Sequence, residues 1–256
     1  MGIRAILFRM KSGTEGLNYG RDIVRGWAAD AAAQRSGGPV TVLDIGLGGG
    51  TDLLGVKAAL GGKGCFLGIE SYAPNVENAR KNGIEVADIN IENTCFPYED
   101  ASIDIVMANQ VLEHTKELFW IFAEVARILK PGGVFIVGVP NLASLHNRVA
   151  LLTGRQPPSI KTLGPHVRGF TKEAMREFAQ SGDFFVLRAY AGSNFYPFPP
   201  AVARRLGRWL PGFAVGNFYR LERTAKTGSF LDVLDREFFE TPYFRGPDNQ
   251  LKEEKA

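Results

Sequence analysis

The sequence predicts an α/β fold: a doubly wound, mostly parallel seven-stranded sheet with helices on both faces. Three observations predict it. Short β-type runs alternate with helical patterns along most of the 256 residues, as in a chain of successive βα units. The strand-like runs are mostly continuously apolar, which is typical of parallel strands covered on both faces. A glycine-rich segment, residues 46–50, lies between the first such run and a helical pattern.

The expected strands are short apolar runs bounded by turn residues. Six belong to the regular alternation and a seventh follows an insertion at Phe195–Phe218. In order they are Val40–Ile45, Cys65–Ile69, Ile84–Ala87, Ile103–Ala108, Val134–Val139, Phe184–Tyr190 and a last one near Phe218–Arg223.

Helices are expected in the intervals. The clearest is Glu117–Leu129, where apolar residues recur at the i, i+3, i+4, i+7 spacing of a buried helical face. Residues 130–133, Lys-Pro-Gly-Gly, follow it; a cation, a proline and two glycines together end a helix. The other expected helices are Tyr19–Ala33, one beginning at Thr51 or Asp52, Leu142–Leu152, and Thr171–Gln180 with a threonine N-cap.

This pattern divides the chain into four parts. Residues 1–36 are expected to hold an N-terminal helix packed across the domain edge, and residues 37–192 to form the main α/β domain. Residues 193–245 are expected to be a basic and aromatic insertion, or cap, together with the last strand. Residues 246–256 are polar and are expected to form a disordered tail.

Charge is distributed unevenly, although the net charge is only +3. Residues 140–226 contain 13 Lys and Arg against 4 acidic residues. This predicts one basic face and an anionic substrate or surface; a solvated face with no partner is the alternative. Within it, residues 195–223 interleave aromatic residues with arginines, as at a peripheral membrane contact. An amphipathic cap with core aromatics is the alternative there.

Cysteine usage and apolar runs bear on metal binding and location. Cys65 and Cys95 show neither metal-ligand spacing nor a CxxC pair, so no metal site and no disulfide framework are expected. The apolar run Ile3–Phe8 is short and lacks a cleavage pattern. No stretch approaches the roughly 18–20 apolar residues of a membrane span. We therefore expect a cytoplasmic protein.

The segment VLDIGLGGG, residues 42–50, predicts a cofactor loop. Gly46, Gly48 and Gly50 alternate, which permits positive φ and close approach of a ligand. A nicotinamide-type pattern would need Gly or Ala where Thr51 stands. Asp44 beneath the loop would repel a pyrophosphate but suits an ammonium and a sulfonium, as in S-adenosylmethionine (SAM). The alternative is that Asp44 has a structural role only and accepts hydrogen bonds from backbone amides in the turn.

Two more acids end the next two strands. Glu70 is placed to accept hydrogen bonds from ribose hydroxyls. Asp88 is placed to accept from an adenine amino group, while the backbone amide of Ile89 serves a ring nitrogen. Because the carboxyl ends of parallel strands meet at one edge, Asp44, Glu70 and Asp88 are expected to share a crevice.

From Thr41 to Tyr190 the sequence resembles the class I SAM-dependent methyltransferases, specifically the small-molecule type of ubiquinone-biosynthesis-like and polysaccharide-associated enzymes. The segments that match are VLDIGLGGG, GIES (with Glu70 and Ser71), VADIN, SIDIVMANQVLEH and LKPGGVFIVGVPN. Leu47 departs from the pattern, where Cys or a small residue is commoner, and so does Gly49, which is often Thr. The resemblance implies a Rossmann-like fold, SAM as cofactor and a small-molecule acceptor.

The resemblance also implies roles outside the loop. Asn109 and Gln110 lie beside the methionine portion of the cofactor, and the turn at residues 112–114 borders the substrate pocket. The N-terminal helix acts as a lid, from which Tyr19 and Arg21 approach the cofactor carboxylate. For these last two, ordinary helix-surface positions are the alternative.

Methyl transfer from a sulfonium is an in-line displacement that depends on near-attack geometry, and a hydroxyl acceptor also benefits from a general base. His114 follows the fourth strand, His166 lies in a loop expected to fold over the same edge, and His146 follows the fifth strand. We expect His166 to be the base or a substrate contact and His114 to shape the pocket. Purely structural roles are the alternative.

The acceptor is expected to be a small anionic molecule, with a saccharide- or lipid-linked hydroxyl. Asn109-Gln110-Val111-Leu112 lacks the Pro-Pro-aromatic motif of nucleic-acid amino methylation, and no Pro-Cys nucleophile is present. Nucleic acid is therefore not expected as a partner. A non-catalytic SAM-binding or partner-binding module and a nicotinamide-dependent oxidoreductase remain as alternatives.

Overall fold

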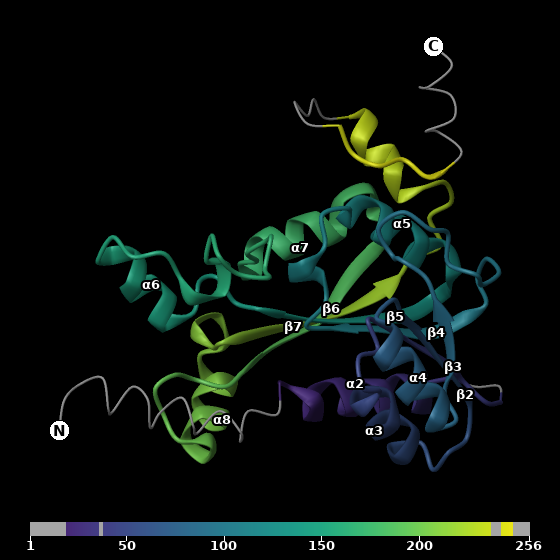
Figure 1. Cartoon of the computed structure of the whole chain (residues 1–256), viewed down its shortest axis with the longest axis horizontal. Coiled ribbons are helices and arrows are strands. Elements are labelled where there is room, and N and C mark those ends of the chain that lie inside the picture. Colours follow the sequence, from purple (N-terminus) through teal and green to yellow (C-terminus); the bar gives the residue numbers. More distant parts are fainter. Residues whose placement is uncertain (1–18, 36–37, 237–241, 248–256) are drawn as a thin grey trace.

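The computed structural model describes residues 19–35, 38–236 and 242–247. In this part of the chain the strands form one sheet in the order β3-β2-β1-β4-β5-β7-β6 (Figure 1). Their bounds are β1 Thr41–Ile45, β2 Cys65–Glu70, β3 Glu85–Asp88, β4 Ile103–Asn109, β5 Leu129–Pro140, β6 Phe185–Ser193 and β7 Gly216–Arg223. All neighbours pair in parallel except β7, which is antiparallel to both β5 and β6. The predicted mostly parallel α/β fold is confirmed.

Helices cover both faces of the sheet. Helices α2 (Arg21–Ala33), α3 (Thr51–Ala59) and α4 (Ala73–Lys81) lie on one face, and α5 (Leu118–Ile128) and α7 (Lys172–Gln180) lie on the other (Figure 1). Helices α6 (Leu145–Leu152) and α8 (Pro200–Trp209) extend from one end of the molecule. The short 3₁₀ helices are η2 Leu112–His114, η3 Pro158–Ile160, η4 Ser181–Asp183, η5 Pro211–Phe213 and η6 Phe230–Asp235. None of the described helices is both long enough and apolar enough to cross a membrane.

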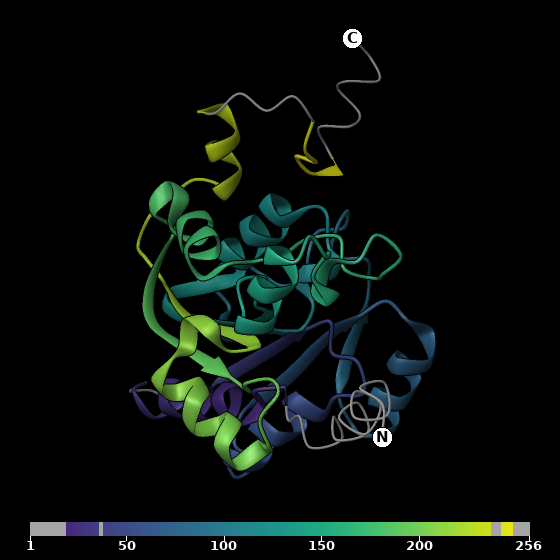
Figure 2. The same ribbon diagram turned by 90° about the vertical axis from the view of Figure 1, so that its left-hand side faces the viewer.

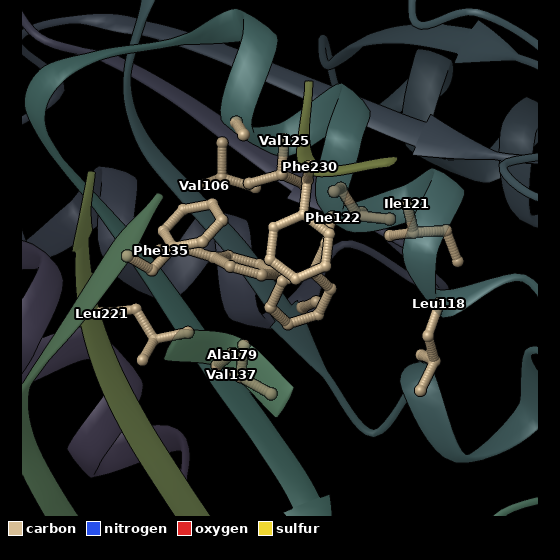
Figure 3. Close-up of a cluster of buried hydrophobic side chains, with 14 of the residues drawn as sticks. Val106, Leu118, Ile121, Phe122, Val125, Phe135, Val137, Ala179, Leu221 and Phe230 are labelled. Carbon is tan, nitrogen blue, oxygen red and sulfur yellow. The ribbon is translucent and has the colours of Figure 1, made fainter. Parts of the chain in front are cut away.

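Two apolar clusters flank the sheet and explain the continuously apolar strands. In β4, Val106 and Ala108 belong to the cluster under α5 and α7, whereas Ile105 and Met107 belong to the cluster under α2, α3 and α4. Successive strand residues point to opposite faces, and here both faces are covered. Figure 3 shows the first cluster, in which Phe122 of α5 lies beside Phe230 of η6.

Several element bounds differ from the sequence prediction. The first helix begins at Arg21, not at Tyr19, because Tyr19 and Gly20 have positive φ values of 47° and 68°. Strand β5 begins at Leu129, which pairs with Ile103. The Lys-Pro-Gly-Gly segment, which was expected to follow the helix and end it, therefore lies within this strand. Helix α6 begins at Leu145, after a turn held by Asn141, whose Oδ1 accepts from the backbone amide of Ala143.

The insertion after β6 contains a helix that the sequence pattern did not predict. Helix α8 starts with Pro200, whose fixed φ suits the first helical position. The chain then returns as β7, which enters the sheet between β5 and β6. The expected division into four parts remains a prediction. Residues 1–18, 36–37, 237–241 and 248–256, on which part of it falls, lie outside the described residues.

Candidate active site

The glycine loop adopts the backbone geometry that its glycines permit. Gly46, Gly48 and Gly50 have φ values of 66°, 54° and 78°, which side chains with a Cβ disfavour. A Cβ at Gly46 would lie 2.5 Å from Cγ2 of Val111. The backbone amides of Gly46 and Leu47 both donate to the carbonyl of Ile69, at 2.9 and 3.0 Å. These bonds hold the loop against the end of β2.

The two departures from the methyltransferase pattern are accommodated without disturbing the loop. Leu47 is buried and packs over Gly68 of β2, where an added Cβ would lie 2.6 Å from Cδ2 of Leu47. The absence of a side chain at Gly68 makes room for the larger one. Gly49 has no positive φ and faces open space, so this position has no steric requirement for glycine.

Glu70 is fixed beside the loop by backbone donors. Its carboxylate accepts hydrogen bonds from the amide of Gly48 at 2.8 Å and from those of Ser71 and Tyr72 at 2.9 Å each. The side-chain amide of Asn75 donates to it at 3.3 Å. These four donors set the carboxylate at the tip of β2, where the sequence predicts contact with a ribose.

Asp44 lies buried beneath the loop, with 3% of its surface exposed. Burial raises its pKa well above the usual range, the negative charges of Asp52 and Glu70 raise it further, and a hydrogen bond from the backbone amide of Leu53 opposes them. A cation next to these acids favours the ionised form of Asp44. The loop is therefore electrostatically suited to a positively charged ligand.

One cavity of about 460 Å³ joins several of the predicted residues. It is lined by Gly46, Glu70, Ser71, Ile89, Gln110 and His114, and also by Ile69, Asn75, Asn90, Ile91, Glu92, Val111 and Thr115. Asp88 is not among the lining residues; it is exposed at the tip of β3, in register with Glu70. Asp44, which is buried beneath the loop and close enough to Glu70 for their charges to interact, is not among the lining residues either. Of the three acids predicted to share one crevice, Glu70 lines this cavity.

Asp52 is a site residue that the sequence analysis did not identify. Its Oδ1 accepts from Nε of Arg21 at 3.0 Å, and its Oδ2 accepts from Nδ2 of Asn109 at 2.9 Å. Asn109 also donates to the carbonyl of Tyr19 at 3.3 Å. The N-terminal residues Tyr19 and Arg21 are therefore tied to the loop region. The available sequence signal was an acid in the first turn of the helix after the glycines.

The turn after β4 carries backbone strain. Gln110 has a φ of 60°, which is uncommon for a residue with a side chain and recurs at functional sites. Its amide donates to the carbonyl of Gly138 at 2.7 Å. Within the described residues, the buried Oδ1 of Asn109 has no hydrogen-bond partner. Both predicted cofactor contacts therefore stand at a constrained turn beside the cavity.

Two of the three histidines meet. The rings of His114 and His166 lie edge to face with their centroids 4.7 Å apart, and His114 lines the cavity. His146 lies apart from this pair, against Tyr196, and burial lowers its pKa. Glu113, between Leu112 and His114, is buried, and burial raises its pKa to about 7.

The sheet order, the glycine loop and the acids beside it define a cofactor-binding α/β domain of the class I methyltransferase type. Residues 43–137 match the family model described as a methyltransferase domain. Within residues 43–137 the chain therefore has a methyltransferase domain of the class I SAM-dependent type.

Curated relatives and solved structures agree with this assignment. A probable SAM-dependent methyltransferase of Mycolicibacterium smegmatis is 35% identical over 36% of this chain and 32% of its own length. Malonyl-[acyl-carrier protein] O-methyltransferase of Xylella fastidiosa is 26% identical over 83% of this chain and 70% of its own length. A Thermotoga maritima SAM-dependent methyltransferase structure superposes with a TM-score of 0.53 at 20% identity, covering 79% of this chain and 92% of that one. At that identity the likeness shows the fold alone.

The chain spans only about a third of the length of the first two curated relatives that it matches, 31% and 32%. The mitochondrial ubiquinone biosynthesis O-methyltransferase of Homo sapiens is 27% identical over 61% of this chain and 44% of its own length.

Proposed function

We propose that this protein transfers a methyl group from SAM to a small-molecule acceptor. The observation that carries the proposal is the buried Asp44 beneath a loop of three glycines with positive φ. A cationic cofactor without phosphate matches this charge, whereas a dinucleotide pyrophosphate opposes it. The related proteins named above support SAM over a nicotinamide cofactor.

The chain's own residues have separate roles in this proposal. Asp44, Glu70, Ser71, Asp88, Ile89, Asn109 and Gln110, together with the loop glycines, bind and orient the cofactor, and Tyr19 and Arg21 close over its carboxylate. His166 and His114 face the acceptor side, where His166 contacts the acceptor or takes the proton of its hydroxyl. Orientation of the acceptor against the sulfonium supplies much of the rate.

Isothermal titration with SAM tests the cofactor site. Asp44→Ala and Glu70→Ala should each weaken SAM binding by about 1–3 kcal/mol, because each removes a charged hydrogen-bond partner. Glu77→Ala, which changes an exposed acid on α4, is the matched control and should bind SAM like the wild type. Unchanged affinity in both test variants, or binding of NAD in place of SAM, would overturn the proposal.

The acceptor is proposed to be anionic and either saccharide- or lipid-linked, because residues 140–226 are basic. Transfer of labelled methyl from SAM to fractions of a cell extract tests activity. A labelled small molecule that carries acidic groups is the expected product. A protein that binds SAM but labels no fraction would favour the non-catalytic binding module instead.

Exposed apolar side chains favour a lipid surface as the place where this acceptor is met. Three such side chains are almost fully exposed: Leu152, which ends α6, at 87%; Trp209, which ends α8, at 82%; and Leu163, which lies outside both helices, at 98%. The guanidinium of Arg148 lies 4.7 Å from the ring centroid of Phe213, which joins α6 to η5. Figure 2 turns this end of the molecule toward the viewer. Apolar tips beside arginines suit an anionic membrane surface.

Sedimentation with lipid vesicles tests this contact. The wild type should sediment with vesicles that contain anionic lipid and less with neutral ones. Trp209→Ser and Leu152→Ser should reduce sedimentation without changing SAM affinity, since both residues lie far in sequence from the glycine loop and neither lines its cavity. If the variant that combines Trp209→Ser with Leu152→Ser sedimented as much as the wild type, the membrane contact would be disproved.

A further inference from the structure

Glu113, His114 and His166 form a compact cluster of ligand-type side chains. One carboxylate oxygen and one ring nitrogen from each histidine all lie within 4.8 Å of one another. Two members come from the turn η2 after β4, and the third comes from the loop after η3. Because His166 is remote from the other two in sequence, their spacing gives no metal motif, and the sequence analysis expected no metal.

Both imidazoles are oriented by backbone carbonyls. Nδ1 of His114 lies 3.2 Å from the carbonyl oxygen of Pro165, and Nδ1 of His166 lies 2.7 Å from that of Ser159. A carbonyl only accepts, so each Nδ1 carries a proton, and Nε2 is the nitrogen whose lone pair is available in the neutral ring. This is the arrangement in which histidines bind metals, since a carbonyl on one nitrogen fixes the tautomer and orientation of the other.

The carboxylate of Glu113 needs a positive partner. The residue is 1% exposed, and its Oε2 has no hydrogen-bond partner within the described residues. An ionised buried carboxylate is costly unless it is paired or coordinates a metal. The nearby Arg168 does not serve it, because its guanidinium donates to the carbonyls of Thr115 and Lys116.

The backbone holds the three side chains in place. The carbonyl of Glu113 accepts from the amides of Val167 and Arg168, at 2.8 and 3.2 Å. The loop that carries His166 is therefore bonded directly to the turn that carries the other two members. The cluster is built into the fold from both sides.

We propose that Glu113, His114 and His166 bind one divalent transition-metal ion. Two imidazoles and one carboxylate are the donor set of Zn²⁺, Co²⁺ or Fe²⁺ and not of Mg²⁺ or Ca²⁺, which prefer oxygen. At metal–ligand distances of about 2.0–2.2 Å the three atoms must draw closer together, which side-chain rotation allows. Three protein ligands leave coordination positions open for a further group.

The position of the site suggests what that further group is, and this step rests on the proposed function. His114 lines the same cavity as Gly46 and Glu70, so the ion lies on the acceptor side of the cofactor. Its open positions suit an acceptor with a pair of oxygens, such as a hydroxyl beside a carboxylate or a second hydroxyl. The ion would lower the pKa of that hydroxyl, and the contact of His166 with the acceptor would run through the ion.

Titration of chelator-treated protein, made without a histidine tag, with Co²⁺ tests the site. Visible absorption and calorimetry should show one ion per chain. His166→Ala and Glu113→Gln should each weaken binding about tenfold or more, because each removes a ligand. His146→Ala removes the histidine outside the cluster and should bind Co²⁺ like the wild type. Thermal unfolding of each variant verifies that it is folded.

Two results would overturn the proposal: a wild type that binds Co²⁺ no more tightly than the variant lacking both His114 and His166, or a wild type that binds Mg²⁺ as tightly as Co²⁺. Titration of the same samples with SAM separates this proposal from the proposed function. A protein that binds SAM but does not bind Co²⁺ would disprove the metal site and leave the proposed function standing. Binding of Co²⁺ without SAM removes the methyltransferase proposal and its acceptor role for the ion, and leaves the metal site.

Discussion

The side-chain amide of Asn109 donates to the carboxylate of Asp52 at 2.9 Å, across 57 positions of sequence. This bond joins the end of β4 to the first turn of α3. Since Arg21 of α2 pairs with the other oxygen of Asp52 at 3.0 Å, one carboxylate connects three elements around the glycine loop. The loop therefore depends on a contact between side chains as well as on its own backbone.

Exchanging the two groups of this bond tests the connection. Asn109→Asp places a second carboxylate against Asp52 and should lower the free energy of unfolding by about 1–3 kcal/mol, because it replaces a bond to a charged group with repulsion. Combining it with Asp52→Asn restores a carboxylate–amide pair and should recover most of the loss. Urea unfolding measures both. A double variant less stable than Asn109→Asp would show that the two side chains are not coupled in this way.

Gly46 should tolerate no side chain. Gly46→Ala forces a Cβ into Val111 at a φ of 66°, so we expect at least a tenfold loss of SAM affinity and a destabilisation of about 1–3 kcal/mol. Gly49→Ala introduces the same methyl group into open space and serves as the control, with near wild-type affinity. Calorimetry and urea unfolding of the pair give the answer. Equal behaviour of the two variants would contradict the geometry described for the loop.

Binding of SAM should depend on pH through Asp44. Its pKa in the free protein is raised by burial and by the charges of Asp52 and Glu70, whereas a bound cation favours its ionised form. Affinity should therefore be highest above that raised pKa and should fall as the pH drops through it. Calorimetry over a series of pH values measures this, with proton release on binding as a second readout. Asp44→Asn should bind more weakly and lose this pH dependence; an unchanged dependence would assign the proton elsewhere.

Glu113 should make stability depend on pH. Its pKa is raised from 4.5 to about 7, so the folded state holds a proton that the unfolded chain releases earlier. The resulting stabilisation is complete below about pH 4.5 and is lost as the pH rises to about 7, a change of up to about 3 kcal/mol. Glu113→Gln, measured with a chelator present, should lack this part of the decline. Its facing groups, His114, His166 and Arg168, stay the same in both proteins.

The exposed variant Glu77→Gln is the control and should follow the wild-type pH profile. If Glu113→Gln follows it as well, the Glu113 carboxylate ionises normally in the folded protein. A wild type that becomes more stable as metal is added at about pH 7 or above, while Glu113→Gln does not, would agree with both this prediction and the proposed metal site.

Much of the fold was predictable because it is encoded by neighbouring residues. The alternation of apolar strands and helices predicted the α/β sheet. The mostly apolar β4 indicated burial on both faces, as the two clusters confirm. The bounds were less accurate. Tyr19 was placed in a helix because the composition of residues 19–33 is compatible with one. The positive φ values of Tyr19 and Gly20 exclude these two residues from the helix.

The sequence by itself determined that the cofactor loop could adopt positive φ at its alternate glycines, because that backbone freedom is a property of single residues. The meeting of Arg21, Asp52 and Asn109, and that of Glu113 with His114 and His166, was decided only by the tertiary structure. Such contacts depend on which strands pair and how the loops after them pack, and no local pattern carries that information. Asp88 shows the same limit, since a strand end predicts the edge of the sheet that a side chain reaches but not whether it lines the cavity there.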